Sequence, residues 1–227
     1  MPTSRPEVWD IITLSVKQIF QRMAFWILPN LWAVLLSIPI VTWPAAKAAL
    51  YKTVVDGLRD PSGIRIKPRQ VFRQAFFQHL SKSILLSFFN LLVLVTILIS
   101  IYFWIGQGQR LLNYVAIMAL LLFMMWWMCQ PFLFPIMVEN PSLSLPQLIR
   151  QAIILVSRQP LNAFLVTLAT TLITLLGLVL LGPILLLVPS LAALISIQAY
   201  WAMVGEEIPD FIDPVEYENR QRRLKTK

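Results

Sequence analysis

Residues that could do chemistry are few in this chain of 227 residues, because His79 is its only histidine and Cys129 its only cysteine. A Ser–His–Asp hydrolase would depend on that histidine, and no Gly-x-Ser-x-Gly motif accompanies it. One cysteine excludes a disulfide framework within the chain and a zinc or iron–sulfur site built from its cysteines. A phosphate-binding loop, Gly-x-x-x-x-Gly-Lys, is absent as well. We therefore predict a protein that is not an enzyme and has no catalytic residues, cofactor or metal.

The remaining isolated polar groups have a structural and a functional interpretation. Glu139 ends an apolar stretch and precedes Asn140-Pro141. Its carboxylate could relay protons at a membrane edge, or it could simply be solvated or cap the next helix. We expect His79 to be a polar residue at the membrane interface and Cys129, among Trp and Met residues, to be a packing residue.

Small and hydroxyl side chains recur at helical spacing in the last third of the chain. Thr167, Thr171 and Thr174 form one such stripe, and Ala192 and Ser196 form another. Threonine and serine in apolar helices bond to their own helix or to a neighbouring one, and small residues permit close helix packing. These residues therefore mark packing seams or, for the threonines, a path for a solute.

A basic cluster is formed by Arg65, Lys67, Arg69 and Arg73. Each cation beside a bilayer contributes about 1 kcal/mol of attraction to anionic lipid. Neither an aromatic stacking platform nor a helix-turn-helix pattern accompanies the cluster, which argues against nucleic acid as a partner. We expect contact with membrane lipids.

The composition indicates the fold class. Hydrophobic residues make up 58% of the chain, charged residues only 13%, and the mean hydropathy is +0.71. A membrane-crossing helix needs about 20 mostly apolar residues. Five stretches qualify and predict an all-α, polytopic transmembrane bundle. They cover residues 24–43, 83–105, 112–138, 161–181 and 184–204.

Three further segments are amphipathic and predict helices that lie at the membrane interface, at about residues 6–22, 68–82 and 146–159. With the spans they form a single transmembrane domain over residues 1–205. Residues 206–227 form a charged tail with six acidic residues followed by five basic ones. Such a segment is typical of a solvated extension that can dock onto a partner.

The basic residues predict an orientation. With five spans, fifteen of the 19 Lys and Arg residues fall on one side of the membrane, in the first and third connections and the C-terminal tail. The positive-inside rule assigns that side to the cytoplasm. It then places the N-terminus outside, unless the proline-containing first span is re-entrant. A bacterial inner (plasma) membrane fits the helical spans and the absence of glycosylation sequons.

Two segments resemble each other and suggest an internal repeat. Residues 70–77, QVFRQAFF, align without gaps with residues 147–154, QLIRQAII, and each leads into an apolar span. Both copies would begin on the same side of the membrane, so the repeat would be parallel, as in some transporters. The simpler interpretation is that both are interfacial helices of one common pattern.

Residues 30–55 carry a more specific pattern. Asn30-Leu31-Trp32, the segment 37–42 (SIPIVT) and the segment 48–51 (AALY) resemble the signature region of the YesL-like family of bacterial integral membrane proteins. The basic, Phe-rich segment 71–76 and the count of about five spans fit as well. Trp43 departs from the pattern, because a small residue is expected before Pro44.

The resemblance implies a function but no site. Members of the family have no established activity and no agreed functional residues, and they are often encoded beside ABC-type carbohydrate importers. This implies an accessory or regulatory subunit of a larger membrane complex such as a sugar importer, with other membrane-protein subunits as partners. The alternative is a small-solute facilitator or channel with a site at the repeat interface.

Overall fold

The computed structural model describes residues 7–39, 41–60, 66–106, 110–179 and 187–209, and this part of the chain is all-α, as the composition predicts. Every described residue outside a helix lies in a turn or a short connection. The helices are α1 (Val8–Gln21), α2 (Met23–Ser37), α3 (Trp43–Arg59), α4 (Pro68–Gly106), α5 (Arg110–Glu139), α6 (Leu145–Arg158), α7 (Pro160–Val179) and α8 (Val188–Val204).

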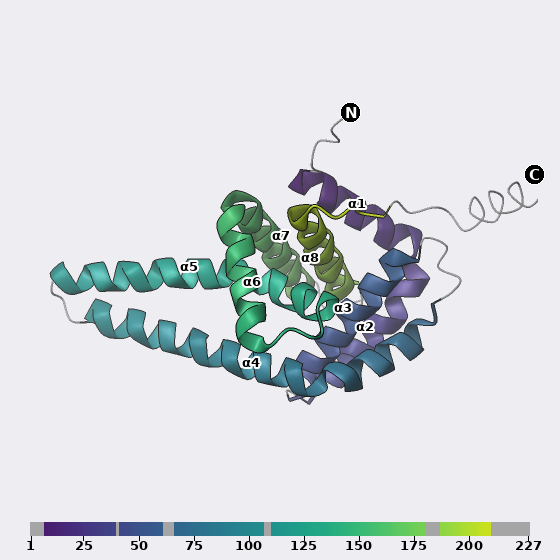
Figure 1. The fold of residues 1–227 in the computed structure, drawn as a ribbon, viewed down its shortest axis with the longest axis horizontal. Helices are drawn as coiled ribbons and strands as arrows, with labels where there is room; N and C mark the ends of the chain where they lie inside the picture. Colours follow the sequence, from purple (N-terminus) through teal and green to yellow (C-terminus); the bar gives the residue numbers. More distant parts are fainter. Residues whose placement is uncertain (1–6, 40, 61–65, 107–109, 180–186, 210–227) are drawn as a thin grey trace, which may run out of the picture.

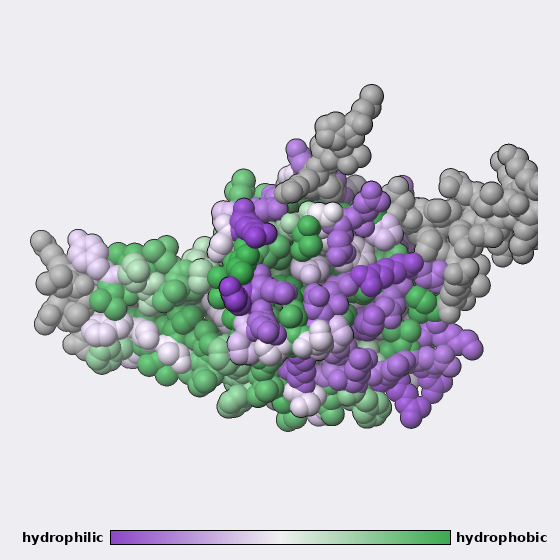
Figure 2. All heavy atoms as spheres, in the orientation of Figure 1, coloured by the Kyte–Doolittle hydropathy of each residue, from purple (hydrophilic) through white to green (hydrophobic). Residues whose placement is uncertain are grey.

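Two long helices form an apolar arm that projects from the rest of the molecule (Figure 1). We define the arm as residues 84–104 of α4 and 114–130 of α5, and the body as the other described residues. The arm has no charged side chain, and most of its large apolar side chains are exposed. Figure 2 shows hydrophobic residues along the arm and hydrophilic ones gathered on the body. This distribution is the one expected of a hairpin surrounded by lipid.

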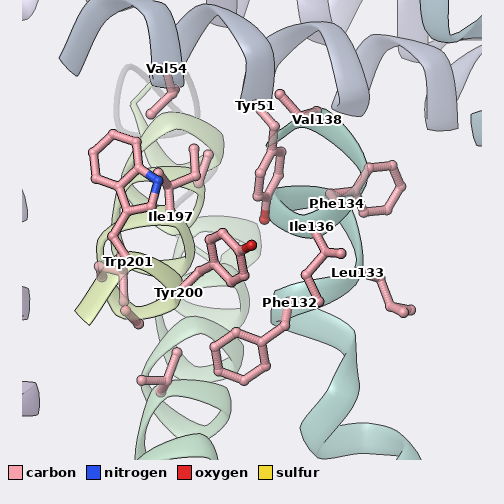
Figure 3. Close-up of a cluster of buried hydrophobic side chains, with 14 of the residues drawn as sticks. Tyr51, Val54, Phe132, Leu133, Phe134, Ile136, Val138, Ile197, Tyr200 and Trp201 are labelled. Carbon is pink, nitrogen blue, oxygen red and sulfur yellow. The ribbon is translucent and has the colours of Figure 1, made fainter. Parts of the chain in front are cut away.

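The core of the body lies where α3, the last part of α5 and α8 meet. Figure 3 shows Tyr51 reaching from α3 between Phe134 of α5 and Tyr200 of α8. Residues 131–138 of α5 and 193–203 of α8 are buried without a break. Alanines 45, 46, 48 and 49 give α3 a small-residue surface on which its neighbours pack closely.

The eight basic residues within 44–82 predict a connection between spans, but the structure contains the helix α3 in the first part of this segment. It pairs with α2 as a helical hairpin. Gly57, near the end of α3, lies against Phe25 and Trp26 at the start of α2, and a Cβ at Gly57 would come within 2.8 Å of the Phe25 ring. Ala33, later in α2, shares a cluster with Ala45 and Ala49 from the first half of α3.

This hairpin bears on the predicted placement of the N-terminus on the outer side. The guanidinium of Arg22, between α1 and α2, donates to the carbonyl oxygens of Gly57 and Asp60, each at 3.2 Å. Arg22 and the end of α3 therefore lie on the same side of any bilayer. The chain also turns by 97° between α1 and residues 25–37 of α2. Both features favour the re-entrant alternative for the predicted first span.

The two copies of the proposed repeat differ in structure. In the first copy, the predicted interfacial segment 68–82 and the span that follows it are one continuous helix, α4. In the second copy, α6 ends at Arg158, and α7 begins at Pro160 after Gln159, whose backbone is non-helical. Proline lacks a backbone donor and disfavours helical geometry in the residue before it, and the position equivalent to Pro160 in the first copy is Ser83.

The described helices include three that are long and apolar enough to cross a membrane, within Pro68–Trp104, Tyr114–Glu139 and Pro160–Gly177. A fourth is added if the bent pair of α1 and α2 counts as one span. The helix α8 is apolar but has only 17 residues, and the start of the predicted fifth span lies outside the described residues. A multi-pass membrane protein is therefore supported, with three to four candidate spans among the described residues against the five predicted.

Candidate functional site

A seam of polar side chains runs through the body between α3, α5 and α8. At one end the Tyr51 hydroxyl donates to Ser196 Oγ at 3.4 Å, and the Ser196 hydroxyl donates to the Ala192 carbonyl oxygen at 2.8 Å. Lys47, one helical turn before Tyr51, places its Nζ 4.6 Å from the centre of the Phe134 ring. The rings of Trp43 and Tyr51 lie at 6.0 and 5.9 Å from the same Nζ. Lys47 is thus surrounded by aromatic faces, an arrangement that stabilises a cation.

The other end of the seam is an ion pair. Arg59 Nη2 lies 2.5 Å from Glu139 Oε2, and the Trp201 indole N–H donates to Glu139 Oε1 at 3.1 Å. The Arg59 guanidinium also lies 5.6 Å from the centre of the Trp201 ring. The Glu139 side chain is only 9% exposed. Both carboxylate oxygens therefore have a partner, so Glu139 joins α3, α5 and α8 rather than extending freely into solvent.

The aromatic surroundings change the protonation of two residues of α3. Burial lowers the pKa of Lys47 from 10.5 to about 8, because water is removed from the ammonium group. Burial likewise raises the pKa of Tyr51 to about 12, an effect that the hydrogen bond with Ser196 opposes. Among the described residues no carboxylate lies within ion-pair distance of Lys47. A neutral Lys47 at moderately alkaline pH is the consequence.

The pKa of Lys47 predicts how stability depends on pH. Between about pH 8 and 10.5 the unfolded chain binds more protons at this position than the folded chain. The free energy of unfolding therefore rises with pH in that interval. We expect Lys47→Met to flatten this rise between pH 8 and 9.5, where Tyr51 does not yet titrate. Denaturation of both proteins in detergent at several pH values measures the slope, and equal slopes would contradict the assignment.

A second polar group joins α1 to α8. The Ser15 hydroxyl donates to Gln198 Oε1 at 3.0 Å, and the Gln198 amide donates to Gln18 Oε1. The indole N–H of Trp26 donates to the Gln18 carbonyl oxygen at 3.3 Å. Ser15, Gln18 and Gln198 are all buried. Buried polar groups that are fully bonded hold helices in one register, and this group fixes α1 against the body.

At the base of the arm an amide pair joins α4 to α5. Asn90 Nδ2 donates to Gln130 Oε1, and Gln130 Nε2 donates to Asn90 Oδ1, both at 2.9 Å. The Trp126 indole N–H donates to the same Asn90 oxygen at 2.7 Å. Farther out, the hydroxyls of Thr96 and Ser100 bond to carbonyls of their own helix. These polar groups of the arm are satisfied internally, as hydrocarbon surroundings require.

Removal of this amide pair gives a second prediction. Asn90→Leu leaves Gln130 Oε1 and the Trp126 indole N–H without partners in an apolar setting, whereas Gln130 Nε2 keeps the Trp126 carbonyl oxygen at 3.3 Å. We expect the free energy of unfolding to fall by about 0.6–2 kcal/mol, the range for hydrogen bonds between helices in membranes. Thr96→Val is the matched control, because its hydroxyl bonds only within α4. Denaturation in mixed micelles measures the free energy of unfolding of both variants. Equal losses would show that the hydrogen bonds between α4 and α5 contribute no more to stability than a hydrogen bond within α4.

The described hydrogen bonds of the threonine stripe include bonds within its own helix, α7. The Thr167 hydroxyl donates to the Ala163 carbonyl at 2.7 Å, and the Thr174 hydroxyl donates to the Thr170 carbonyl at 2.7 Å. Thr167 is buried, Thr171 is half-buried and Thr174 is exposed. The bonds of Thr167 and Thr174 are those of a packing seam. The second stripe does lie at a helix contact, because Ser196 accepts the hydrogen bond from Tyr51.

The basic cluster is described in part. Arg65 lies outside the described residues, whereas Lys67, Arg69 and Arg73 are exposed at the start of α4. The Arg69 guanidinium lies 5.7 Å from the centre of the Trp32 ring of α2. Contact of these cations with lipid stays a prediction.

The other singled-out residues are buried. Cys129 is fully buried, as expected of a packing residue. His79 is only 3% exposed, so it packs against other residues of the body, and its place at the membrane interface stays a prediction. In the part of the chain that the structure describes, no group of three or more His, Cys, Asp or Glu residues could hold a metal ion.

Several residues of the seam were missed from the sequence. Lys47, Tyr51 and Arg59 were placed in a connection, although Pro44 and the alanines of α3 offered a helix signal. Pro is favoured in the first turn of a helix, and the alanines with Val54, Val55 and Leu58 give the segment one apolar face. Ser15, Gln18 and Gln198 had no sequence signal, because nothing local links residues so far apart.

Comparisons with known proteins do not extend this description: no protein-family model, curated protein or solved structure matches the chain. The resemblance of residues 30–55 to the YesL-like family stays a prediction.

Proposed function

We propose that the chain is a non-enzymatic subunit of a larger membrane complex, and that its arm docks against membrane helices of a partner protein. The observation that carries the proposal is the arm itself. Two apolar helices project from the body with most of their large side chains exposed, while the side chains of Asn90, Thr96, Ser100 and Gln130 are hydrogen-bonded within the arm. Such a surface is suited to contact with lipid and with other helices, which associate in membranes through packing.

The charge distribution supports an orientation for this subunit. The described cations Arg59, Lys82, Arg150 and Arg158 lie in the body, and none lies in the arm. By the positive-inside rule the part of the body that carries these cations is on the cytoplasmic side. We propose a bacterial plasma membrane as the location, with the C-terminus in the cytoplasm. An ABC-type sugar importer is the partner that the family resemblance implies.

The arrangement gives less support to a facilitator or channel. The two helices of the arm cannot by themselves enclose a path, and the hydroxyls of Thr167 and Thr174 donate to carbonyl oxygens of their own helix, α7. The seam between α3, α5 and α8 is closed by aromatic rings and the Arg59–Glu139 ion pair. A subunit that binds a partner through its arm needs no open path through the body, so the closed seam is compatible with this function.

Purification from native membranes in a mild detergent tests the proposal. We expect the tagged chain to retain a partner protein in stoichiometric amount, identified by mass spectrometry. Leu91→Ala with Leu98→Ala removes two exposed side chains from one face of α4 and should reduce this recovery severalfold. Leu175→Ala with Leu176→Ala is the matched control on the exposed face of α7. Recovery of the chain alone, or equal losses in both variants, would contradict docking through the arm.

A further inference from the structure

A hollow of about 560 Å³ lies between α4 and α6. Figure 1 shows α6 crossing the base of the arm, so the hollow is located where the apolar arm meets the charged body. Its volume falls within the roughly 300–1,000 Å³ of ligand pockets in proteins. Its lining consists of Phe89 from α4 and of Leu145, Pro146, Ile149, Arg150, Ile153 and Ile154 from α6.

The sequence of α6 explains why this wall is apolar. The helix begins with a capping box in which the Ser144 N–H donates to Gln147 Oε1 at 2.9 Å. Leu148 and Ala152 face the core of the body and are fully buried. Ile149 and Ile153 follow them on the adjoining side and face the hollow. Because α6 is apolar on these two adjoining sides, it has more apolar surface than the body covers, and the uncovered part faces the hollow.

Positive charge lies at one edge of the hollow. Arg150 is exposed, and within the described residues its guanidinium has no hydrogen bond or ion pair. Lys82 lies two helical turns before Phe89 on the same face of α4, and its Nζ donates to the carbonyl oxygens of Pro141 and Leu143. The lining contains no carboxylate. An apolar hollow with the unneutralised Arg150 guanidinium in its lining, and with Lys82 two helical turns from Phe89 on α4, is complementary to an amphiphile with an anionic head.

We propose that this hollow binds an anionic phospholipid, with one acyl chain against Phe89, Ile149 and Ile153 and its phosphate on Arg150. Arginine suits this role because its planar guanidinium donates two parallel hydrogen bonds to phosphate oxygens. The second cation, Lys82, adds attraction for a head group with net negative charge. Among the residues that line this site only Phe89 belongs to the arm, and Leu91 and Leu98, which test docking, do not line it.

Native mass spectrometry of the full chain, with palmitoyl-oleoyl phosphatidylglycerol or phosphatidylcholine added to the detergent, tests the proposal. We expect tight occupancy by one phosphatidylglycerol and weaker occupancy by phosphatidylcholine. Arg150→Gln should weaken phosphatidylglycerol binding about tenfold, as expected for loss of a charged hydrogen bond. Arg158→Gln is the matched control, because Arg158 is exposed on the same helix but does not line the hollow.

A second variant tests the acyl-chain part of the site. Ile149→Trp fills the hollow without altering its charge and should lower binding of both lipids. Unchanged phosphatidylglycerol binding in both Arg150→Gln and Ile149→Trp would overturn the proposal. So would a loss of phosphatidylglycerol binding in Arg158→Gln as large as that in Arg150→Gln. A third contradicting result would be thermal stabilisation of the protein by inorganic phosphate alone that equals the stabilisation by phosphatidylglycerol. The last would indicate an anion site that takes no acyl chain. Partner recovery by the arm is measured separately, so lipid binding can fail without contradicting the proposed docking.

Discussion

Trp201→Ala is expected to lower the free energy of unfolding by about 3–5 kcal/mol, the range for removal of a large buried aromatic side chain. Trp201 is 2% exposed and lies in the core where α3, α5 and α8 meet (Figure 3). Its loss opens a cavity between these helices. It also leaves Glu139 Oε1 without the indole N–H and removes the ring beside the Arg59 guanidinium.

Two comparisons separate these contributions. Trp201→Phe retains most of the packing but removes the hydrogen bond to Glu139, so we expect a loss smaller than that of Trp201→Ala. Trp9→Ala removes a side chain that is 72% exposed and should change stability by less than about 0.5 kcal/mol. Denaturation in detergent micelles measures all three. A loss in Trp201→Ala no larger than that in Trp9→Ala would contradict the packing described for the body.

Gln198→Leu is expected to have the next largest effect, because it removes the link between α1 and α8. The Ser15 hydroxyl loses its acceptor and the Gln18 side chain loses its donor, and both groups stay buried. A buried polar group left without a partner costs about 1–3 kcal/mol. The first helix should also detach more readily, which limited proteolysis of the N-terminal segment would detect.

The triple variant Ser15→Ala, Gln18→Leu and Gln198→Leu is the control for this prediction. Replacement of every partner by an apolar side chain removes the unsatisfied groups and is often nearly neutral. We therefore expect the triple variant to be more stable than Gln198→Leu alone. If it is equally or less stable, the cost of Gln198→Leu comes from side-chain shape, and the hydrogen bonds do not determine the position of α1.

The helices with uninterrupted apolar sequence were predictable. Residues 83–105 and 112–138 match parts of α4 and α5, and residues 161–181 match α7 closely, because long apolar runs have few alternatives to a helix. The amphipathic segment 146–159 is α6 almost to the residue, since Ser144 and Gln147 supply the capping signal. These elements depend on local sequence alone.

The elements that depend on tertiary packing were not predictable in this way. The helix α3 carries Lys47, Lys52, Asp56 and Arg59, and these charges suggested a connection between spans. In the structure Lys52 pairs with Asp56 at 2.6 Å within the helix, and Arg59 pairs with Glu139 of α5. Charge that is neutralised by pairing does not prevent a helix from lying in the body. The sequence alone does not reveal such pairs between distant segments.

The residues of the candidate site also divide into those that local sequence predicts and those that only tertiary packing brings together. Ser196 was singled out as a packing residue and lies at a helix contact, bonded to Tyr51. Glu139 was noted as a lone carboxylate, whereas its partners Arg59 and Trp201 become visible only once three helices are placed together. The threonine stripe is recognisable by its spacing, and the hydroxyls of Thr167 and Thr174 donate to carbonyl oxygens of α7, as in a packing seam. A path for a solute along the stripe stays a prediction.

Photo-crosslinking in native cells tests most directly whether the arm docks onto another membrane protein. A benzophenone amino acid replaces Leu98 of α4 or Leu121 of α5, both exposed on the arm, and replaces the fully buried Phe132 as the control. We predict that both arm positions crosslink to the same membrane protein of discrete mass and that the Phe132 position does not. Crosslinks to lipid alone, or only to a second copy of the chain, would contradict the proposed accessory subunit.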